Sequence, residues 1–445
     1  PTLSEQDIKV LIDKKKLATH SCLVDYIRSN SHYDFAELSK IAELANAQRE
    51  DNAAYYTRQD ICYTIVKNLP DAKNYTELNI LEPSIGVGNF LPALILKYAG
   101  VQSVNIDVVD IDANSLEILK ELVTKIDVPN NIHINYINAD FLLHNFDKRY
   151  DIVVGNPPYK KLTKEKQLLA KYKIGASNKD TNNIFSFFIE KAMRIGNVVS
   201  LIVPKSLINA PEFDATRTLM KEKNISRIID FGEKGFKGVK IETICFILDT
   251  QKKPQNTFVE SYITDEVKCH QQAYLTDDRF PYWIIYRNEA FDEVADKMEF
   301  NVFKAYRDRV ITKAITKDNG KIRVLKSRNI GNNEIVNIPD YDCYIDSIEG
   351  LDVAKYLNQA NCVLLPNLTY NPRACFLPKG CIADGSVAIL TLAKDDDIVT
   401  NEDLAFYATD SFTKFYAIAR NLGTRSLNID NNSVFFFGKL KQQRI

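Results

Sequence analysis

Between about residues 51 and 250, short apolar runs alternate with stretches whose apolar residues recur at helical spacing. Runs of four to eight apolar residues bounded by polar or turn residues are typical of buried strands. The repeated order of strand, helix and strand predicts a doubly wound α/β sheet. The runs predicted as strands are 79–81, 104–109, 132–137, 151–154, 198–203, 227–230 and 243–248.

The two ends of the chain follow different patterns. Residues 1–50 repeat apolar positions at helical spacing and predict an N-terminal helical segment without evident chemistry. The polar stretch 251–256 ends the alternation and predicts a linker. Beyond it, strand-like pieces separated by Asn, Gly and Pro predict an α+β domain. We therefore expect a helical segment over 1–50, an α/β domain over 51–252 and an α+β domain over 253–445.

The composition limits the class of protein. A chain of 445 residues is long enough for two or three domains, and its net charge of −1 disfavours a histone-like binder but not an enzyme with one basic face. The nearest cysteines, Cys375 and Cys381, have no partners at a zinc-like spacing, so we expect buried thiols and no metal. Residues 1–16 contain no signal-peptide core, and no apolar run approaches about 18 residues. These features predict a cytoplasmic protein.

A glycine-containing loop follows the first predicted strand. Gly86 and Gly88 allow a tight turn and a close approach of a ligand to the backbone, although a plain turn would need the same residues. The third glycine of a dinucleotide-binding loop is missing, and Glu82 precedes the pair. A carboxylate suits a cationic ligand such as S-adenosylmethionine better than it suits a pyrophosphate.

Acidic residues also end the next two predicted strands. Asp110 is placed to hold ribose hydroxyls, or it caps the following helix. Asp140 can accept a hydrogen bond from an adenine amino group while Phe141 packs on the ring, or the pair forms a capped turn with a core aromatic. Ligands of doubly wound folds bind at the carboxyl ends of the strands. Three acids at successive strand ends therefore predict a ligand site at that edge.

The most specific segment is 151–159, in which an apolar strand runs into Gly-Asn-Pro-Pro-Tyr. Because proline fixes φ and removes a donor, this backbone is rigid and its carbonyls remain acceptors. The Asn156 side-chain oxygen and the Pro157 carbonyl can together accept both hydrogens of an exocyclic amine. Tyr159 offers a flat face on which a base can stack.

This segment, Asn156-Pro157-Pro158-Tyr159 after 151–155, resembles the hallmark of S-adenosylmethionine-dependent amino-methyltransferases. The glycine-containing loop after the first predicted strand, here called the cofactor loop, precedes this tetrapeptide, and a long tail follows it. That order resembles the γ group of DNA adenine-N6 methyltransferases from restriction–modification systems. The resemblance covers residues 52–250 and extends weakly beyond. It implies an S-adenosylmethionine cofactor, duplex DNA as the substrate, flipping of the target adenine, and a monomeric, nucleoid-associated prokaryotic protein with a possible separate cognate endonuclease.

The resemblance also implies roles for individual residues. Segment 54–61 resembles the part that wraps the cofactor, although the family usually has Pro where Arg58 stands, and Ile85 replaces a small residue or Cys. Phe236, in the glycine-flanked segment 232–240, is the expected second aromatic of the base pocket. The implied cofactor contacts are Tyr56, Thr57, Glu82, Ser84, Gly86, Gly88, Asp110, Ile111, Asp140, Phe141 and Asn156. The implied catalytic residues are Asn156, Pro157, Pro158, Tyr159 and Phe236.

Basic residues concentrate in the predicted C-terminal domain. Residues 304–328 contain nine Lys and Arg against Asp308 and Asp318, which indicates a phosphate-contacting face or a solvated surface. A second basic segment, 420–427, places two arginines around a Gly-Thr turn. We expect a target-recognition domain here, whose DNA contacts are Lys313, Lys317, Lys321, Arg323, Lys326, Arg328, Arg420 and Arg425.

Three other functions share parts of this pattern. Cytosine-N4 methyltransferases more often carry Ser where Asn156 stands, which favours adenine as the target. Protein glutamine methyltransferases also use Asn-Pro-Pro-Tyr, but they are usually shorter and lack a long basic C-terminal region. A catalytically silent DNA-binding subunit would not need the intact tetrapeptide. The first 50 residues are too short for a nuclease domain, so we expect no endonuclease activity.

Overall fold

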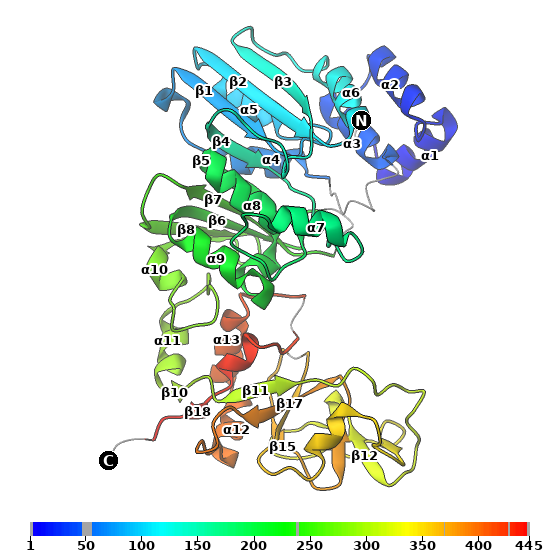
Figure 1. Ribbon diagram of the computed structural model, residues 1–445, viewed down its shortest axis with the longest axis vertical. Coiled ribbons are helices and arrows are strands. Elements are labelled where there is room, and N and C mark those ends of the chain that lie inside the picture. Colours follow the sequence, from blue (N-terminus) through cyan, green and yellow to red (C-terminus); the bar gives the residue numbers. More distant parts are fainter. Residues whose placement is uncertain (1–2, 47–55, 237–239, 369, 426–427, 443–445) are drawn as a thin grey trace. The chain divides into compact units, whose positions relative to one another are not determined.

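The computed structural model describes residues 3–46, 56–236, 240–368, 370–425 and 428–442 (Figure 1). The chain forms two compact units. The N-terminal unit comprises residues 1–207 and 212–273, and the C-terminal unit comprises 208–211 and 274–445. A short piece of the C-terminal unit therefore lies within the sequence of the N-terminal one.

A nine-stranded sheet forms the centre of the N-terminal unit. Its order is β3-β2-β1-β4-β5-β7-β6-β8-β9, in which neighbours from β3 to β5 are parallel and β7 runs antiparallel between β5 and β6. The strands are β1 (Glu77–Glu82), β2 (Ser103–Asp110), β3 (Ile132–Asn138), β4 (Tyr150–Gly155), β5 (Gly196–Pro204), β6 (Asn224–Gly232), β7 (Thr243–Asp249), β8 (Asn256–Ser261) and β9 (Glu266–Gln271).

The central strands are continuous apolar runs because helices cover both faces of the sheet (Figure 1). Residues 152–154 of β4, for example, are fully buried. The helices of this sheet are α4 (Gln59–Lys67), α5 (Leu91–Tyr98), α6 (Ala113–Val123), α7 (Lys166–Lys173), α8 (Ile184–Ile195) and α9 (Asp214–Lys221). All seven predicted strands are present, and the predicted doubly wound α/β fold is confirmed.

The predicted linker at 251–256 is wrong. Residue 256 begins β8, which pairs in parallel with β6, and β9 then pairs with β8. The sheet therefore continues to Gln271, and the first unit ends at residue 273 instead of 252. The sequence concealed this hairpin because β9 is an edge strand with five of its six side chains exposed, so it has no apolar alternation.

The predicted N-terminal helices are α1 (Glu5–Lys15), α2 (His20–Ser29) and α3 (Phe35–Ala45). They do not form a separate body, because their core includes Leu122 of α6 and Val87 of the loop after β1. An ion pair of 2.8 Å between Arg28 and Glu121 also joins α2 to α6. The segment is therefore part of the N-terminal unit.

The C-terminal unit combines helices with three small sheets, as the prediction of an α+β domain requires. Its described residues include two apolar clusters, one rich in phenylalanine and one that contains residues of β12 and β16. Its strands are β10 (Met298–Glu299), β11 (Phe303–Tyr306), β12 (Ile322–Leu325), β13 (Cys343–Ile345), β14 (Val363–Pro366), β15 (Cys375–Phe376), β16 (Cys381–Ala383), β17 (Val387–Leu392) and β18 (Lys439–Leu440).

Three longer helices complete this unit: α11 (Glu289–Asp296), α12 (Asn401–Tyr407) and α13 (Asp410–Ala419). The short α10 (Gln272–Leu275) follows β9, where the chain passes from one unit to the next. Across the described part of the chain, no helix combines the length and the apolar character that crossing a bilayer needs.

Candidate functional site

The parallel strands place the predicted acids along one edge of the sheet. Glu82 ends β1, and Asp110 ends the neighbouring β2. Asp110 is in register with Asn138 of β3, two residues before Asp140. On the other side of β1, β4 ends at Gly155, directly before Asn156. The residues predicted from successive strand ends are thus brought together by the fold.

Gly86 and Gly88, which follow β1, are required for different structural reasons. Both have a positive φ, +56° at Gly86 and +79° at Gly88. A Cβ at Gly88 would meet Leu119 Cδ1 at 2.6 Å, so this glycine permits close packing of α6. A Cβ at Gly86 would meet no described atom within 4 Å. The bare backbone at Gly86 therefore faces open space, as a ligand-binding turn requires.

Glu82 is a buried carboxyl group with an unsatisfied oxygen. The residue is 2% exposed, and among the described residues its Oε2 has no hydrogen-bond partner. Burial, and secondarily the charge of Asp110, raise the pKa of Glu82 well above its usual range. A buried carboxyl without a partner either keeps its proton or binds a cation. This arrangement fits the cationic cofactor predicted from the sequence.

Asp110 is held by backbone amides at the end of β2. Its Oδ2 accepts from Gly86 N at 3.1 Å, and its Oδ1 accepts from Asp112 N at 2.9 Å. Burial raises the pKa of Asp110 to about 6 against the lowering effect of these bonds. The cap of α6 is Asp112, which accepts from Asn114 N, so Asp110 is not the helix cap. The adjacent Ile111 is 66% exposed and can contact a ligand.

The third predicted acid is oriented from two sides. Asp140 accepts from Leu142 N at 2.9 Å and from the Tyr172 hydroxyl at 2.6 Å. The Phe141 ring is only 2% exposed and lies 4.9 Å from the ring of Phe188. The prediction that Phe141 presents its face to an adenine therefore needs correction, because the ring is enclosed and acts as a core aromatic.

The amide of Asn156 is held by two hydroxyl groups. Its Nδ2 donates to Thr57 Oγ1 at 3.1 Å, and its Oδ1 accepts from the Tyr159 hydroxyl at 2.8 Å. The Tyr159 hydroxyl also lies 3.1 Å from the carbonyl of Ile202 at the end of β5. These partners fix which side of the amide bears the oxygen. An amide oxygen accepts two hydrogen bonds, so Oδ1 can bind Tyr159 and a substrate amine together.

The upstream segment is described only in part. Ala54 and Tyr55 lie outside the described residues. Thr57 is 2% exposed and contacts Asn156, whereas Tyr56 packs against the core of the N-terminal helices. Ser84 is half-buried in the loop after β1. The structure thus places Thr57 in contact with Asn156, which sequence reasoning did not predict.

Phe236 contacts Tyr159, although pattern alone would place it in an exposed turn. It is 3% exposed, and its ring centroid lies 6.2 Å from that of Tyr159 at an interplanar angle of 58°. A base between two parallel rings needs roughly 7–8 Å, which is twice the contact distance of ~3.5–4 Å between carbon atoms. The ring pair is therefore closed, which means that the space between the two rings is too narrow to hold a base. Lys237, Gly238 and Val239 of the same segment lie outside the described residues.

A buried lysine, missed in the sequence, ties the ends of the segment that carries Phe236. Lys205 follows β5, and its Nζ lies 2.7 Å from Asp230 of β6 and 3.8 Å from Glu242, directly before β7. Its backbone N–H also donates to the Glu242 carbonyl at 2.9 Å. Lone charged residues at strand ends give no sequence signal of such a cluster. Lys205 links the end of β5 to Asp230 of β6 and to Glu242, the two residues that flank the segment of Phe236.

The structure divides the predicted DNA contacts of the C-terminal unit into buried and exposed residues. Arg420 is 3% exposed beside Tyr282 and Tyr416, so it cannot reach DNA in this structure. Arg323 is also mostly buried and pairs with Asp342 at 2.9 Å. These two predictions are corrected: both side chains hold the unit together.

The other six predicted DNA contacts remain predictions. Lys326 and Arg328 lie over the ring of Tyr341, with Nζ and Cζ 3.8 and 4.8 Å from its centroid. Lys317 pairs with Asp346 but remains largely exposed. The side chains of Lys313, Lys321 and Arg425 are exposed as well.

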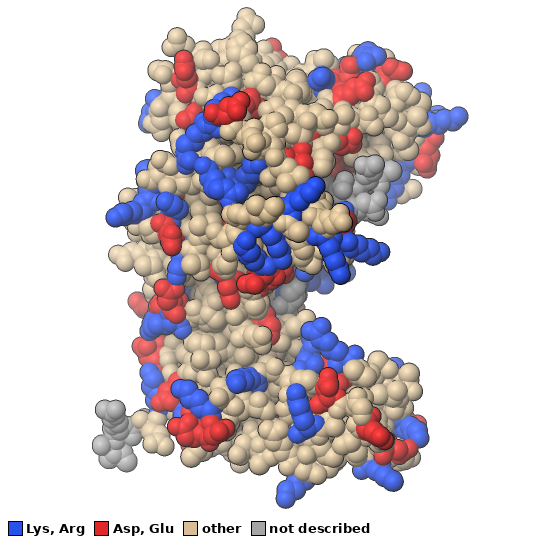
Figure 2. Space-filling model, in the orientation of Figure 1, with Lys and Arg blue, Asp and Glu red and all other residues tan. Residues whose placement is uncertain are grey.

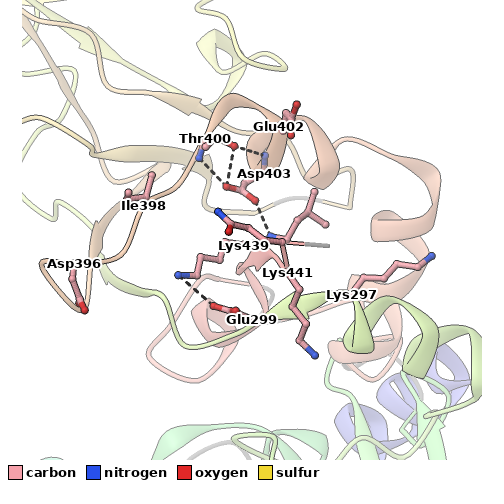
Figure 3. A pocket seen from close by; sticks show the side chains of 11 residues that line it. Lys297, Glu299, Asp396, Ile398, Thr400, Glu402, Asp403, Lys439 and Lys441 are labelled. Carbon is pink, nitrogen blue, oxygen red and sulfur yellow. Dashed lines mark hydrogen bonds and ion pairs between the residues drawn. The ribbon is translucent and has the colours of Figure 1, made fainter. Parts of the chain in front are cut away.

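A pocket in the C-terminal unit contains none of the predicted site residues (Figure 3). Its lining residues bind one another: Lys439 lies 3.3 Å from Glu299, and the backbone amide of Leu440 donates to Asp403 at 2.7 Å (Figure 3). The first contact joins β18 to β10, and the second joins β18 to α12. Among the described residues, no group of His, Cys, Asp and Glu is arranged to hold a metal ion.

The chain is similar in sequence to methylases of restriction–modification systems. Residues 94–236 match the family described as Eco57I restriction-modification methylase. The chain is 32% identical over 235 residues to the Type II methyltransferase M.VspI of Vibrio sp. (strain 343), covering 51% of this chain and 55% of that protein. It is 24% identical over 202 residues to the Type II methyltransferase M.AccI of Acinetobacter calcoaceticus, covering 42% and 35%. The chain thus spans about half the length of M.VspI and less of M.AccI.

Two solved structures share the fold across most of the chain. The type IIG restriction endonuclease BpuSI matches with a TM-score of 0.50 at 14% identity over 92% of this chain and 61% of that chain. The protein in the DrdV–DNA complex matches with a TM-score of 0.50 at 10% identity over 92% and 59%. The predicted resemblance to DNA methyltransferases of restriction–modification systems is confirmed, and so is the predicted fold.

Binding of S-adenosylmethionine should release protons, because a cation beside Glu82 favours its ionised form over the protonated form that burial imposes. Calorimetry near pH 7 in buffers with different ionisation enthalpies measures the number released. Glu82→Gln should release fewer protons than wild type, whereas Glu77→Gln at the other end of β1 should not differ from it. Equal proton release from Glu82→Gln and wild type would contradict this role.

Asp110→Ala should weaken cofactor binding by roughly 1–3 kcal/mol through lost hydrogen bonds to the ribose. Asp112→Ala is the matched control, because it removes the helix cap and should reduce stability without reducing affinity to the same extent. Calorimetric titration with S-adenosylmethionine measures both. An unchanged dissociation constant in Asp110→Ala would leave Asp110 with only a structural role in the turn at Gly86.

Proposed function

We propose that this protein is a site-specific DNA methyltransferase that transfers a methyl group from S-adenosylmethionine to N6 of an adenine flipped out of duplex DNA. The observation that carries the proposal is the fixed amide of Asn156, held between Thr57 and Tyr159 one strand away from the acidic cofactor loop. The methylase match over 94–236 and the M.VspI similarity support the same class of activity.

The cofactor loop would hold the donor through its acids and its bare backbone. Glu82, Asp110 and the turn at Gly86 would bind the cationic and ribose parts, and Asp140 would accept from the adenine amino group. When bound, S-adenosylmethionine supplies an electrophilic methyl group. The enclosed Glu82 carboxyl favours a ligand with positive charge over one with a pyrophosphate.

The loop after β4, which carries Asn156, Pro157 and Tyr159, would hold the target amine. Asn156 Oδ1 and the Pro157 carbonyl accept the two amine hydrogens, which orients the nitrogen lone pair toward the donor. No strong base is required, because the proton can leave once the nitrogen has become cationic. Orientation and preorganised acceptors then supply most of the rate enhancement. Tyr159 and Phe236 would enclose the extruded base after their ring pair opens.

Adenine is proposed over cytosine because Asn, and not Ser, stands at position 156. Single-molecule sequencing of DNA from cells that express the protein gives the modified base and its sequence context together. N6-methyladenine at one recurring sequence is the expected result. N4-methylcytosine would overturn the choice of base, and unmodified DNA would overturn the proposed activity.

Asn156→Ala should reduce the single-turnover methylation rate roughly 100-fold or more, because one aligned acceptor of the amine is lost. Binding of S-adenosylmethionine should stay close to wild type, since Asn156 is proposed to hold the amine. Rapid-quench assays and calorimetry measure the two quantities. A variant that keeps more than about a tenth of the wild-type rate would exclude this hydrogen-bond role.

Phe236→Leu should destabilise the extruded base, because stacking on an aromatic contributes roughly 1–3 kcal/mol per base. A 2-aminopurine at the target position should fluoresce more strongly in the variant complex, since its emission is quenched by stacking. Phe231→Leu is the control: Phe231 is equally buried but packs on Tyr262, 5.0 Å away. Emission and methylation rate that match wild type in Phe236→Leu would make Phe236 a packing residue only.

A further inference from the structure

The segment directly after Tyr159 carries the densest run of lysine in the N-terminal unit. Residues 160–179 contain seven lysines and one acid, Glu165, in a protein whose net charge is −1. Basic side chains gather over the place of α7 in the space-filling view (Figure 2). The lysines are Lys160, Lys161, Lys164, Lys166, Lys171, Lys173 and Lys179.

This lysine segment has a fixed backbone. An apolar cluster that includes Leu162, Ala176 and Phe187 lies beneath it. Glu190 of α8, which is 1% exposed, accepts from the backbone amides of residues 177 and 178 at 2.7 and 2.8 Å. Asn178 is fully buried and donates to Thr216 at 2.8 Å. The two ends of the lysine segment are thus packed and hydrogen-bonded against α8 and α9.

The lysine segment also connects the loop of Asn156 to the acids at the ends of the parallel strands. It begins at the residue after Tyr159, and its bridge between Lys161 and Asn183 joins it to the start of α8. At its other side, Tyr172 of α7 donates to Asp140 at 2.6 Å. The lysine segment therefore lies beside both the loop of residues 156–159 and the end of β3, where Asp140 lies.

Most of these positive charges are not neutralised within the protein. Lys160 pairs with Glu165 at 2.9 Å and Lys161 with Glu212 at 3.5 Å. Within the described residues, Lys164, Lys166, Lys171 and Lys173 form no ion pair. Like charges this close repel one another, and a polyanion removes that cost on binding. Neutralised phosphates would release counterions and add affinity.

We propose that the lysine segment of residues 160–179 binds the phosphodiester backbone of duplex DNA beside the extruded base. The inference rests on the proposed function and assigns part of the DNA contact to the N-terminal unit itself. Lysine suits this task because its ammonium group contacts a phosphate as a point charge, without reading the base sequence.

Lys166→Ala combined with Lys171→Ala tests the proposal by equilibrium binding to duplex DNA over a range of salt concentrations. Each phosphate contact contributes about 0.9 to the slope of log K against log salt, so the pair should reduce its magnitude by roughly two. Lys14→Ala with Lys15→Ala, two exposed lysines of α1, is the matched control and should leave the slope at its wild-type value. A slope in the Lys166–Lys171 variant equal to that of wild type would overturn the proposal.

Methyl transfer to the same duplex by the wild-type protein separates this outcome from the proposed function. If wild type methylates DNA while the lysine variant keeps the full salt slope, only the inference about this surface is wrong. If wild type transfers no methyl group and the slope still falls in the variant, the DNA-binding surface is supported and the proposed activity is wrong.

Discussion

The parallel pairing of β1 with β4 is the constraint on which the candidate site depends. Ile80 and Leu81 are in register with Ile152 and Val153, so the chain leaves both strands at the same edge. The approach is close: a Cβ at Gly155 would lie 3.2 Å from Pro83 Cδ. A donor bound at the loop after β1 and an amine bound by Asn156 would therefore be neighbours without a movement of either strand.

The candidate site contains carboxyl groups and a ring pair that are not expected at a sheet edge with only a structural role. Glu82 is buried and Asp110 is partly buried, and the raised pKa of each carboxyl group disfavours its charged form. The ring pair of Tyr159 and Phe236 is closed, and the buried Lys205 pairs with Asp230 of β6. Such conflicts between burial and charge are expected at functional sites, where binding offsets them.

Much of this site could be predicted because parallel strands convert sequence order into spatial order. Apolar runs identified β1 to β7, and the residues after the parallel strands β1 to β5 had to meet at one edge. The direction in which an arginine side chain points could not be predicted. Arg420 follows α13 and is buried in the core, and Arg323 forms an ion pair with Asp342. Charge alone does not distinguish such residues from exposed ones.

Contacts between distant segments were the other part that remained hidden. Nothing in the sequence couples Thr57 to Asn156 or Lys205 to Asp230, because each pair is joined only by the folded sheet. The hairpin of β8 and β9 was missed for a related reason, since an exposed edge strand carries no apolar pattern.

We propose that this edge of the sheet joins a methyl donor to an adenine amine. Incubation of the purified protein with duplex DNA and S-adenosylmethionine bearing a deuterated methyl group, followed by mass spectrometry of the nucleosides, tests it most directly. We predict deuteromethylated N6-methyldeoxyadenosine. A label found only on cytosine N4 would contradict the assignment of the base, and unlabelled nucleosides would contradict the whole assignment of the site.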